Sequence, residues 1–327
     1  MTNKYNNVYV NDSYTIAGIY EGNGPLKKYF SNIYEKDLYY GEDTFEKAES
    51  RMLSDSMTPL ITKRNNIDLI ISGDLQNQIS SSNYAIRDKN IPFLGIFSAC
   101  ATFGEGIILA SNFIESRNAS NVIVSTSSHN MVCEKQFRNP TEYGAPKKKC
   151  STFTSTGAAS MLLSSKKSNI KVTSSTVGCI CDKGITDVNN MGAVMAIAAA
   201  DTIIKHFNDL NIGPDYYDLI LTGDLGIYGK KILIDYLKTK GINISKNYND
   251  CGLLLYDINK QAVFAGASGP ACSALVTCSY VLKEMEKGKI SRILIVPTGA
   301  IFSPTRVFQK ESIPSIAHAF SLEVTSK

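Results

Sequence analysis

The sequence lacks any apolar run that approaches the ~20 residues needed to cross a bilayer as a helix. Its first twenty residues are polar and contain no apolar core of a secretory signal. We therefore expect a protein that stays on the cytosolic side of a membrane and has no membrane-spanning segment. The net charge is only +4, and Lys147–Lys149 is the one dense basic patch. A nucleic-acid-binding surface would show a concentrated basic stripe, so a nucleic acid is not an expected partner.

The sequence has 8 cysteines, but their spacing does not form a metal site. Cys179 and Cys181 are separated by a single residue, and no second Cys or His pair follows at the spacing typical of zinc ligands. The sequence also contains no EF-hand-like string of oxygen ligands. Thiols are the default state of cysteine in a reducing compartment, so we predict free thiols, no metal site and no cofactor.

An internal repeat organises the chain. Three pairs of segments match in the same order along the sequence, and the second pair aligns Cys100 with Cys272. The pairs are DLIISGDL (68–75) with DLILTGDL (218–225), SACATFGEGIILAS (98–111) with PACSALVTCSYVLK (270–283), and NVIVSTSS (121–128) with RILIVPTGA (292–300). One match could arise by chance, but three in the same order indicate a duplication, in which Asp74 and Asp224 occupy matching places.

Short Val/Ile/Leu-rich runs alternate with amphipathic segments in both halves, which is typical of mostly parallel strands covered by helices on both faces. The predicted strand–helix–strand–helix–strand order is 67–72, 80–89, 92–98, 100–117 and 121–126 in the first half and 217–222, 230–240, 262–266, 271–287 and 292–297 in the second. Segments 154–165 and 170–178 are predicted as antiparallel edge strands. The Ala-rich segment 191–207 is predicted as a buried helix at the join of the halves, with 44–63 as its more polar counterpart.

These elements predict an α/β protein built by internal duplication, with two five-stranded mixed-sheet halves in α-β-α-β-α layers. We place the N-terminal half at residues 1–180, with an insertion loop at about 130–150, and the C-terminal half at residues 181–327. A duplicated unit of this kind, with a cysteine at the N-terminus of a central helix, resembles the thiolase fold, which includes the ketoacyl synthases.

Five blocks of the sequence resemble one family within that fold, the stage V sporulation protein AD family of spore-forming Firmicutes. The blocks are SSHN (127–130), RNPTEYG (138–144), GITD (184–187), DCGLLLY (250–256) and QKESIPSIAHAF (309–320). The resemblance implies a protein that binds dipicolinic acid, usually as its calcium complex, and supports its uptake into the developing spore and its release in germination. It also implies a homodimer that works beside membrane proteins of the same sporulation operon, peripheral to the forespore inner membrane.

Cys100 is the candidate nucleophile of the chain, because a helix N-terminus surrounds a thiolate with backbone N–H dipoles. Acyl transfer also needs a base and an oxyanion donor within hydrogen-bond reach. Enzymes of the resembled fold take these groups from a His after the strand equivalent to 217–222 and from an Asn or His before the central helix of the second half. Here Asp224 follows that strand, and Ala267 and Ser268 precede that helix. An acid beside Cys100 would raise the pKa of its thiol, so the sequence predicts a protein that is not an enzyme.

A cavity without a catalytic base is still suited to an anion at helix N-termini. Dipicolinate is a planar dianion with two carboxylates beside a ring nitrogen, so its site needs donors in one plane, a compensating charge and a flat apolar wall. Arg138 is the expected anchor, because its guanidinium matches a carboxylate. The predicted ligand-binding residues are Cys100, His129, Asn130, Arg138, Glu142, Tyr143 and Asp224.

Two other functions stay open on the sequence alone. Cys100 could act with His129 as a rearranged base in an acyltransferase related to the ketoacyl synthases. Alternatively, the chain could be a structural subunit that binds no ligand. The site residues also have structural interpretations, above all Arg138, whose guanidinium could pair with Glu134 or Glu142 at the surface.

Overall fold

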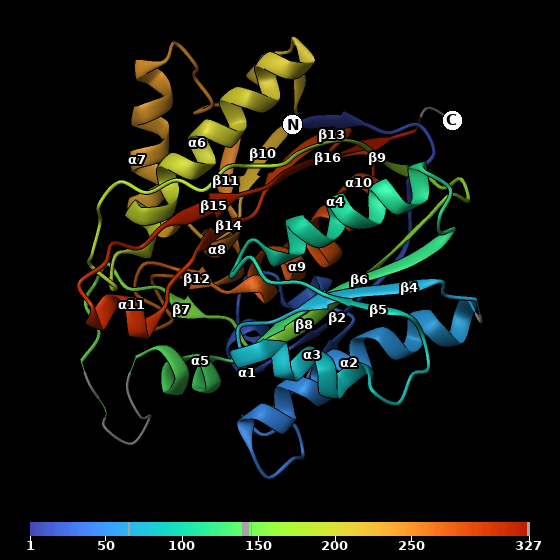
Figure 1. The fold of residues 1–327 in the computed structure, drawn as a ribbon, viewed down its shortest axis with the longest axis horizontal. Coiled ribbons are helices and arrows are strands. Elements are labelled where there is room, and N and C mark those ends of the chain that lie inside the picture. The colour runs from blue at the N-terminus through green and yellow to red at the C-terminus, as the bar shows by residue number, and fades with distance from the viewer. Residues whose placement is uncertain (65, 139–143, 145, 326–327) are drawn as a thin grey trace.

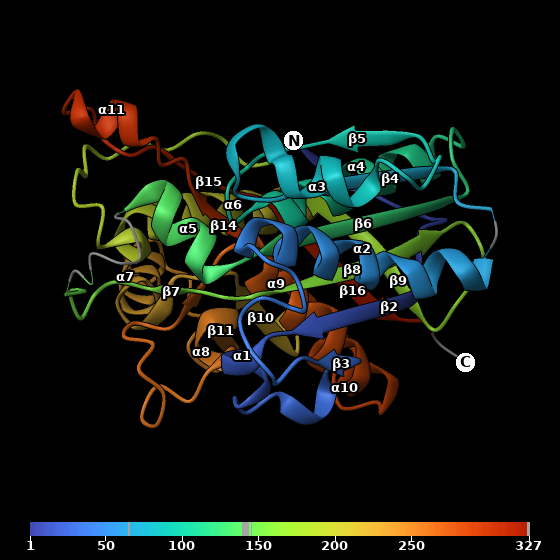
Figure 2. The same cartoon turned by 90° about the horizontal axis from the view of Figure 1, so that it is seen from below.

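The computed structural model describes residues 1–64, 66–138, 144 and 146–325, and it has the five layers that the sequence predicts (Figure 1). Helices α6 and α7 cover the outer face of one set of strands, helices α2 and α3 cover the outer face of the other, and α4 and α9 lie between the two sets (Figures 1 and 2). The α-helices are α1 (Ile19–Gly22), α2 (Phe45–Arg64), α3 (Ser80–Ile86), α4 (Thr102–Glu115), α5 (Asn130–Phe137), α6 (Met191–Leu210), α7 (Gly226–Thr239), α8 (Cys251–Leu255), α9 (Pro270–Val276), α10 (Leu282–Glu286) and α11 (Pro304–Phe308), with π-helix η5 (Thr277–Val281) joining α9 to α10.

The two sets of strands have the same order and the same directions. The first set runs β2 (Tyr9–Ala17), β8 (Gly157–Ser164), β6 (Asn121–Ser128), β4 (Leu69–Gly73) and β5 (Phe93–Gly95), and the second runs β9 (Ile170–Thr176), β16 (Ala319–Val324), β13 (Arg292–Val296), β10 (Leu219–Thr222) and β11 (Tyr248–Asp250). In each set the first two pairings are antiparallel and the last two are parallel. This agreement is the structural form of the duplication seen in the sequence.

Short strands complete the sheets. Strands β2 and β9 pair through Tyr9 and Val10 with Lys171 and Ile170, which joins the two sets into one continuous sheet. The remaining strands are β1 (Thr2–Lys4) beside β9, β3 (Asn32–Ile33) beside β2, β7 (Phe153–Thr154) paired with β12 (Ala267–Ser268), and β14 (Thr298–Ala300) paired with β15 (Ser315–Ala317).

Two segments predicted as edge strands lie in the interior of the sheet. Strand β8 lies between β2 and β6, and β9 lies between β16 and β2. All residues of β8 are buried, because helices cover both faces and strands flank both edges. Strand β9 belongs to the second set by strand order, although its residues precede residue 180, where the sequence analysis divides the two halves. That division stays a prediction.

The prediction of a strand at 262–266 is wrong. That apolar segment forms a turn in which Phe264 has φ +56° and the Ala265 N–H bonds to Ser151 O at 2.9 Å, outside the large sheet. The parallel neighbour of β10 is instead β11, which precedes the short helix α8. Hydrophobic composition could not separate the two segments, because an apolar run is compatible with a strand and with a buried turn.

Helix α6 is buried as predicted, but it covers the outer face of the second set beside α7 and does not lie at the join of the halves (Figure 1). The two helices meet at glycines: a Cβ added to Gly229 would lie 2.5 Å from Gly192 O. Because neither residue carries a side chain, the two backbones approach closely near the start of α6 and α7. This crossing holds the N-terminus of α7 beside the centre of the molecule.

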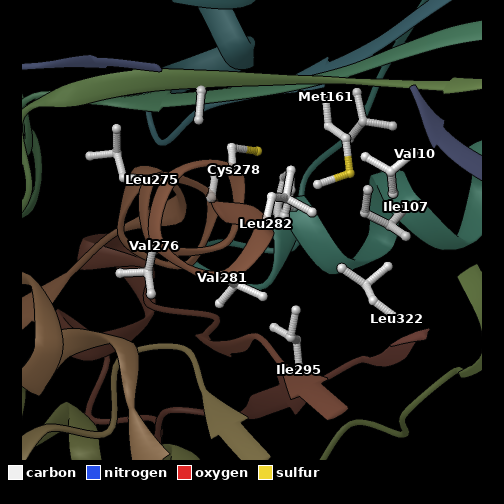
Figure 3. Packing of buried hydrophobic residues seen from close by; sticks show 14 of the residues in the cluster. Val10, Ile107, Met161, Leu275, Val276, Cys278, Val281, Leu282, Ile295 and Leu322 are labelled. Atoms are coloured by element: carbon white, nitrogen blue, oxygen red, sulfur yellow. The ribbon is translucent and has the colours of Figure 1, made fainter. Parts of the chain in front are cut away.

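The main hydrophobic core lies between the two sets of strands and encloses α4 and α9. Figure 3 shows Val10 and Met161 of the first set facing Ile295 and Leu322 of the second, with helical side chains such as Ile107 between them. Alternate residues of β13 serve different layers, since a strand turns successive side chains to opposite faces. Its residues 293 and 295 belong to the central core, whereas residues 294 and 296 pack in the layer under α6 and α7.

We predict that Gly229→Ala lowers the free energy of unfolding by about 1–2 kcal/mol, because the new methyl group overpacks the backbone of Gly192. The better helix propensity of alanine, about 1 kcal/mol, only partly offsets this loss. Gly213→Ala is the control, since a Cβ there meets no atom within 4 Å. Urea denaturation followed by circular dichroism measures both variants, and equal stability of Gly229→Ala and the parent chain would contradict the close crossing.

Candidate functional site

Asp224 reaches the centre of the molecule from the turn between β10 and α7. The carboxylate of Asp250 shapes this turn by accepting hydrogen bonds from the backbone N–H groups of Leu225 (2.9 Å) and Gly226 (3.0 Å). Gly226 has φ +62°, a left-handed conformation that glycine adopts without steric cost. The sequence Gly-Asp-Leu-Gly therefore turns the backbone sharply at the end of the strand and leaves the Asp224 side chain at the start of α7.

The Asp224 carboxylate is buried and hydrogen-bonded by three other segments. It accepts hydrogen bonds from Thr298 Oγ1 of β14 (2.7 Å) and from the backbone N–H of Gly269 before α9 (3.2 Å), and it is bonded to the Cys100 thiol. Burial is the largest influence and raises the pKa of Asp224 to about 7, although the hydrogen bonds oppose the change. An acid that exchanges a proton near neutral pH therefore stands beside the Cys100 sulfur.

Cys100 lies on a tight turn between β5 and α4. Ala99 has φ +49°, and the Thr102 hydroxyl holds the turn by donating to Ala99 O (2.6 Å) and accepting from the Ser98 N–H (3.0 Å). Burial, followed by the neighbouring Asp224 carboxylate, raises the pKa of the Cys100 thiol well above its usual value. The predicted effect of Asp224 on the thiol is confirmed, and the start of α4 at Thr102 does not offset it.

Cys100 and Asp224 line a partly open cavity of about 80 Å³. A water molecule needs about 10–15 Å³ on this scale, so several waters fit. Among the described residues, three charged side chains, two thiols and three hydroxyl groups line the cavity, and the other lining residues are apolar. The lining residues are Glu134, Arg138 and Asp224; Cys100 and Cys133; Thr152, Thr154 and Ser268; and Leu75, Phe97, Ala99, Phe137, Met191, Met195, Ala300 and Phe302.

Arg138 lines the cavity from the end of α5 and is paired with an acid. Its Nη1 donates to Glu134 Oε1 at 2.8 Å, and Lys147 Nζ bonds to the same oxygen at 2.8 Å. The side chains of Arg138 and Glu134 are 19% and 14% exposed. Arg138 thus pairs with Glu134, as one interpretation of the sequence expected, and also lines the cavity, while its role as an anchor for an anion stays a prediction. One hydrogen bond uses only part of the five N–H donors of a guanidinium.

His129 and Asn130 lie at the start of α5, and neither is among the described residues that line the cavity. His129 Nδ1 accepts from the Met131 N–H (3.3 Å), and Nε2 donates to Leu38 O (2.8 Å), so backbone groups occupy both ring nitrogens. Burial lowers the pKa of His129 below its usual value. The cavity therefore does not bring these two residues together with Arg138, and their role in binding a ligand stays a prediction.

Two more predicted residues, Glu142 and Tyr143, lie outside the described residues. Sequence reasoning missed the aromatic wall, which consists of Phe97, Phe137 and Phe302. Phe137 stands next to Arg138 in the sequence, which is a local signal, whereas the other two come from distant loops.

An open groove of about 720 Å³ shares part of this wall with the cavity. Leu75, Phe97, Phe137 and Phe302 line both spaces, and the rings of Phe137 and Phe302 lie 5.6 Å apart. Phe97 is 47% exposed, so its ring lies at the surface. Of the described residues that line the groove, none is charged. An aromatic wall thus separates a polar cavity from an uncharged surface groove.

Asp74 occupies the place in the first half that Asp224 occupies in the second, but its surroundings differ. Its carboxylate accepts hydrogen bonds from the backbone N–H groups of Gln76 (2.8 Å) and Ser82 (2.8 Å), within its own half. Burial raises the pKa of Asp74, and burial together with Asp74 raises the pKa of the neighbouring Glu49 to about 8. Since Asp74 is not a lining residue of the cavity, the duplicated acids have diverged.

The other two histidines also bond internally. His318 Nδ1 accepts from the Gly178 N–H (3.3 Å), and burial lowers the pKa of His318 to about 4. His206 bonds to Thr176 and Tyr217. Within the described part of the chain, no histidine lines the cavity, and no three or more Cys, His, Asp or Glu side chains gather as metal ligands would.

We predict that Asp224→Asn increases the alkylation rate of Cys100 by iodoacetamide at about pH 8 by roughly tenfold, the effect of lowering a thiol pKa by one unit. The reason is that the variant removes a carboxylate that disfavours the thiolate. Asp74→Asn is the matched control, because it changes the equivalent acid away from the cavity. Peptide mass spectrometry measures the rate, with the exposed Cys179 as an internal reference. An unchanged Cys100 rate would contradict the contact between the two groups.

The chain is similar to known proteins of one family along nearly its whole length. The family model for stage V sporulation protein AD matches residues 2–323. The chain is 44% identical to stage V sporulation protein AD of Bacillus subtilis (strain 168) over 320 residues, which are 97% of this chain and 94% of that protein. No helix in the described residues has both the length and the apolar character needed to span a membrane.

Solved structures with a similar fold come from condensing enzymes. A variant of Xanthomonas campestris OleA has a TM-score of 0.60 at 13% identity and covers 98% of this chain and 99% of its own. The 3-oxoacyl-[acyl-carrier-protein] synthase III of Aquifex aeolicus VF5 has a TM-score of 0.54 at 12% identity, with 97% and 99% covered. At such low identity the similarity concerns the fold, and it confirms the thiolase-like architecture. The family model over nearly the whole chain and the 44% identity to the Bacillus subtilis protein show that this chain belongs to the stage V sporulation protein AD family.

Proposed function

We propose that this sporulation protein is a non-catalytic thiolase-fold protein that binds dipicolinic acid in the Cys100–Asp224 cavity. It would support uptake of the acid, as the calcium complex, into the developing spore, and its release in germination. The observation that carries the proposal is the cavity itself, which has kept its place at the centre of a condensing-enzyme fold while an acid stands beside its sulfur.

The surroundings of Cys100 argue against acyl transfer. A nucleophilic thiol needs a base that removes its proton, and burial and Asp224 both favour the protonated thiol. His129, the candidate base of a rearranged acyltransferase, has both ring nitrogens bonded to backbone groups. Acyl transfer is therefore less well supported than binding of a ligand without catalysis.

The chemistry of the cavity suits a small planar acid. Arg138 supplies a guanidinium for one carboxylate, and the hydroxyls of Thr152, Thr154 and Ser268 add donors. Phe137 and Phe302 provide apolar faces for an aromatic ring. A cavity of about 80 Å³ favours a compact ligand over a long acyl chain, because the chain would need a tunnel.

We propose that calcium arrives with the acid and is not held by a resident site. In the described residues, no cluster of three or more ligating side chains exists for a resident metal. The acid would supply most of the calcium ligands through its carboxylates and ring nitrogen, since calcium prefers oxygen donors. The calcium complex of dipicolinate also carries no net charge, which reduces the cost of placing it beside Asp224 and Glu134.

We also propose that the chain works as a homodimer beside membrane proteins of its operon, peripheral to the forespore inner membrane. Strand β5 lies at the edge of the first set of strands. Its residue Leu94 is 38% exposed, and Phe97, which follows the strand, is 47% exposed, which supports pairing of two chains through this edge.

We predict that sedimentation velocity gives the mass of two chains for the parent protein. Leu94→Glu should shift the mass toward one chain, while Tyr84→Glu, on the exposed side of α3, should not. A single-chain mass for the parent protein would contradict the dimer.

We predict that Arg138→Ala weakens dipicolinate binding by about 1.5–3 kcal/mol, the cost of losing a hydrogen bond to a charged group. That range is roughly a tenfold to 150-fold increase in Kd. Glu134 keeps Lys147 as a partner in the variant, so the loss is not caused by an unpaired acid. Isothermal titration calorimetry with and without calcium measures the affinity.

Arg51→Ala is the control for this experiment, because Arg51 pairs with Glu42 at the surface and does not line the cavity. An unchanged affinity of Arg138→Ala would remove Arg138 from the site. If the parent chain binds neither the acid nor its calcium complex, the proposed function is wrong and a purely structural subunit is favoured.

A further inference from the structure

The described charged groups at the cavity include two acids, and only one of them, Glu134, is paired with cations. Among the described lining residues the charged groups are Arg138, Glu134 and Asp224. Glu134 already bonds to both Arg138 and Lys147. Together with Lys147, the three lining groups have no net charge when Asp224 is ionised and a net charge of +1 when Asp224 is protonated. The protonation state of Asp224 therefore decides whether the cavity attracts or merely tolerates an anion.

Burial and the neighbouring Asp250 disfavour the charge of Asp224, and the hydrogen bonds from Thr298, Cys100 and Gly269 only partly offset them. Asp250 of β11 adds a second carboxyl on one side, and the thiols of Cys100, Cys251 and Cys272 approach from the start of α4, from α8 and from α9. The nearby cation on these elements, Lys230 of α7, interacts with Asp250. Thr298 and Gly269 donate hydrogen bonds but carry no charge. Burial among these groups keeps the proton of Asp224 exchangeable near neutral pH, where its pKa is about 7.

We infer that Asp224 selects the charge state of the ligand: it is protonated when metal-free dipicolinate is bound, donates a hydrogen bond to a ligand carboxylate, and makes binding of the dianion take up one proton. This inference rests on the proposed function. The proton comes from solvent, adds to an Asp224 carboxylate oxygen on binding, and returns to solvent on release. No covalent bond to the ligand forms or breaks. The neutral calcium complex needs no such proton, so the same cavity binds it without proton uptake.

The position of Asp224 in the cavity wall supports a direct contact with the ligand in addition to its hydrogen bonds within the protein. Asp224 lines the cavity together with Arg138, so a dicarboxylate bound to the guanidinium brings its second carboxylate close to the acid. The Thr298 hydroxyl donates to Asp224 Oδ1, so in the protonated acid the other oxygen, Oδ2, can carry the proton that a ligand carboxylate would accept. Asp74 offers the internal comparison: it is also buried after a strand, but its oxygens are bonded by Gln76 and Ser82 of its own half and it does not line the cavity.

The test is calorimetry of the parent chain with dipicolinate, with calcium removed by a chelator, at about pH 6 and about pH 8, where the carboxylates of the ligand stay ionised. Two buffers with different ionisation enthalpies at each pH measure the protons taken up. With a free-protein pKa of about 7, we expect affinity about tenfold weaker at the higher pH and uptake of close to one proton there. Asp224→Asn should abolish both effects, whereas Asp74→Asn should keep them. The calcium complex should bind the parent chain with little proton uptake.

The outcomes separate this inference from the proposed function. Binding of metal-free dipicolinate at about pH 8 without proton uptake, or pH dependence that persists in Asp224→Asn, would overturn the role of Asp224 and leave the proposed function standing. Absence of binding at either pH, with and without calcium, would overturn both. The parent chain alone decides the question of proton uptake, so the result does not depend on whether a variant folds.

Discussion

The contact between Asp224 and Cys100 joins the two halves of the chain, and the candidate site depends on it. Each residue comes from a turn at the end of a strand in its own half, and the packing of α4 and α9 between the two sets of strands brings the turns together (Figure 1). The backbone of Gly299 approaches the Cys100 turn so closely that a Cβ there would lie 2.3 Å from Ser98 O. The position of the sulfur is therefore set by close packing of backbone and not by a flexible loop.

Burial determines what chemistry this contact supports. In a region of low dielectric, both a thiol and a carboxyl group favour their neutral forms. The Asp224 carboxylate further raises the pKa of the Cys100 thiol, whereas the hydrogen bond from that thiol lowers the pKa of Asp224 and only partly offsets its burial. At the end of β10 the acidic side chain of Asp224 stands beside the sulfur, and together with burial it favours the protonated thiol of Cys100.

The fold was predictable to a large extent because its signals are local and repeated. The matched segments ending in Asp74 and Asp224, the alternation of apolar runs with amphipathic helices and the Ala-rich α6 all survive in the structure. The errors occurred where an apolar segment had more than one physical solution, as at 262–266, or where the neighbours of a strand decide whether it is an edge, as for β8.

The site was predictable only in part. Cys100, Asp224 and Arg138 line one cavity as expected, whereas His129 and Asn130 lie outside its wall. Sequence position placed these last two correctly at the end of β6, but the His129 ring bonds to Leu38 O of a distant loop, which no local pattern reports.

The sequence by itself determined the duplication, the layer order and the acid Asp224 at the end of the second matched segment, because these follow from periodicity and from residue identity at aligned positions. The tertiary structure alone decided that Asp224 and not Asp74 faces the cavity, that Arg138 is paired with Glu134, and that aromatic rings from separate loops form the wall. The physical reason is that a pocket is made by contacts between segments far apart in the chain, and the packing of side chains that closes it has no periodic signal in the sequence.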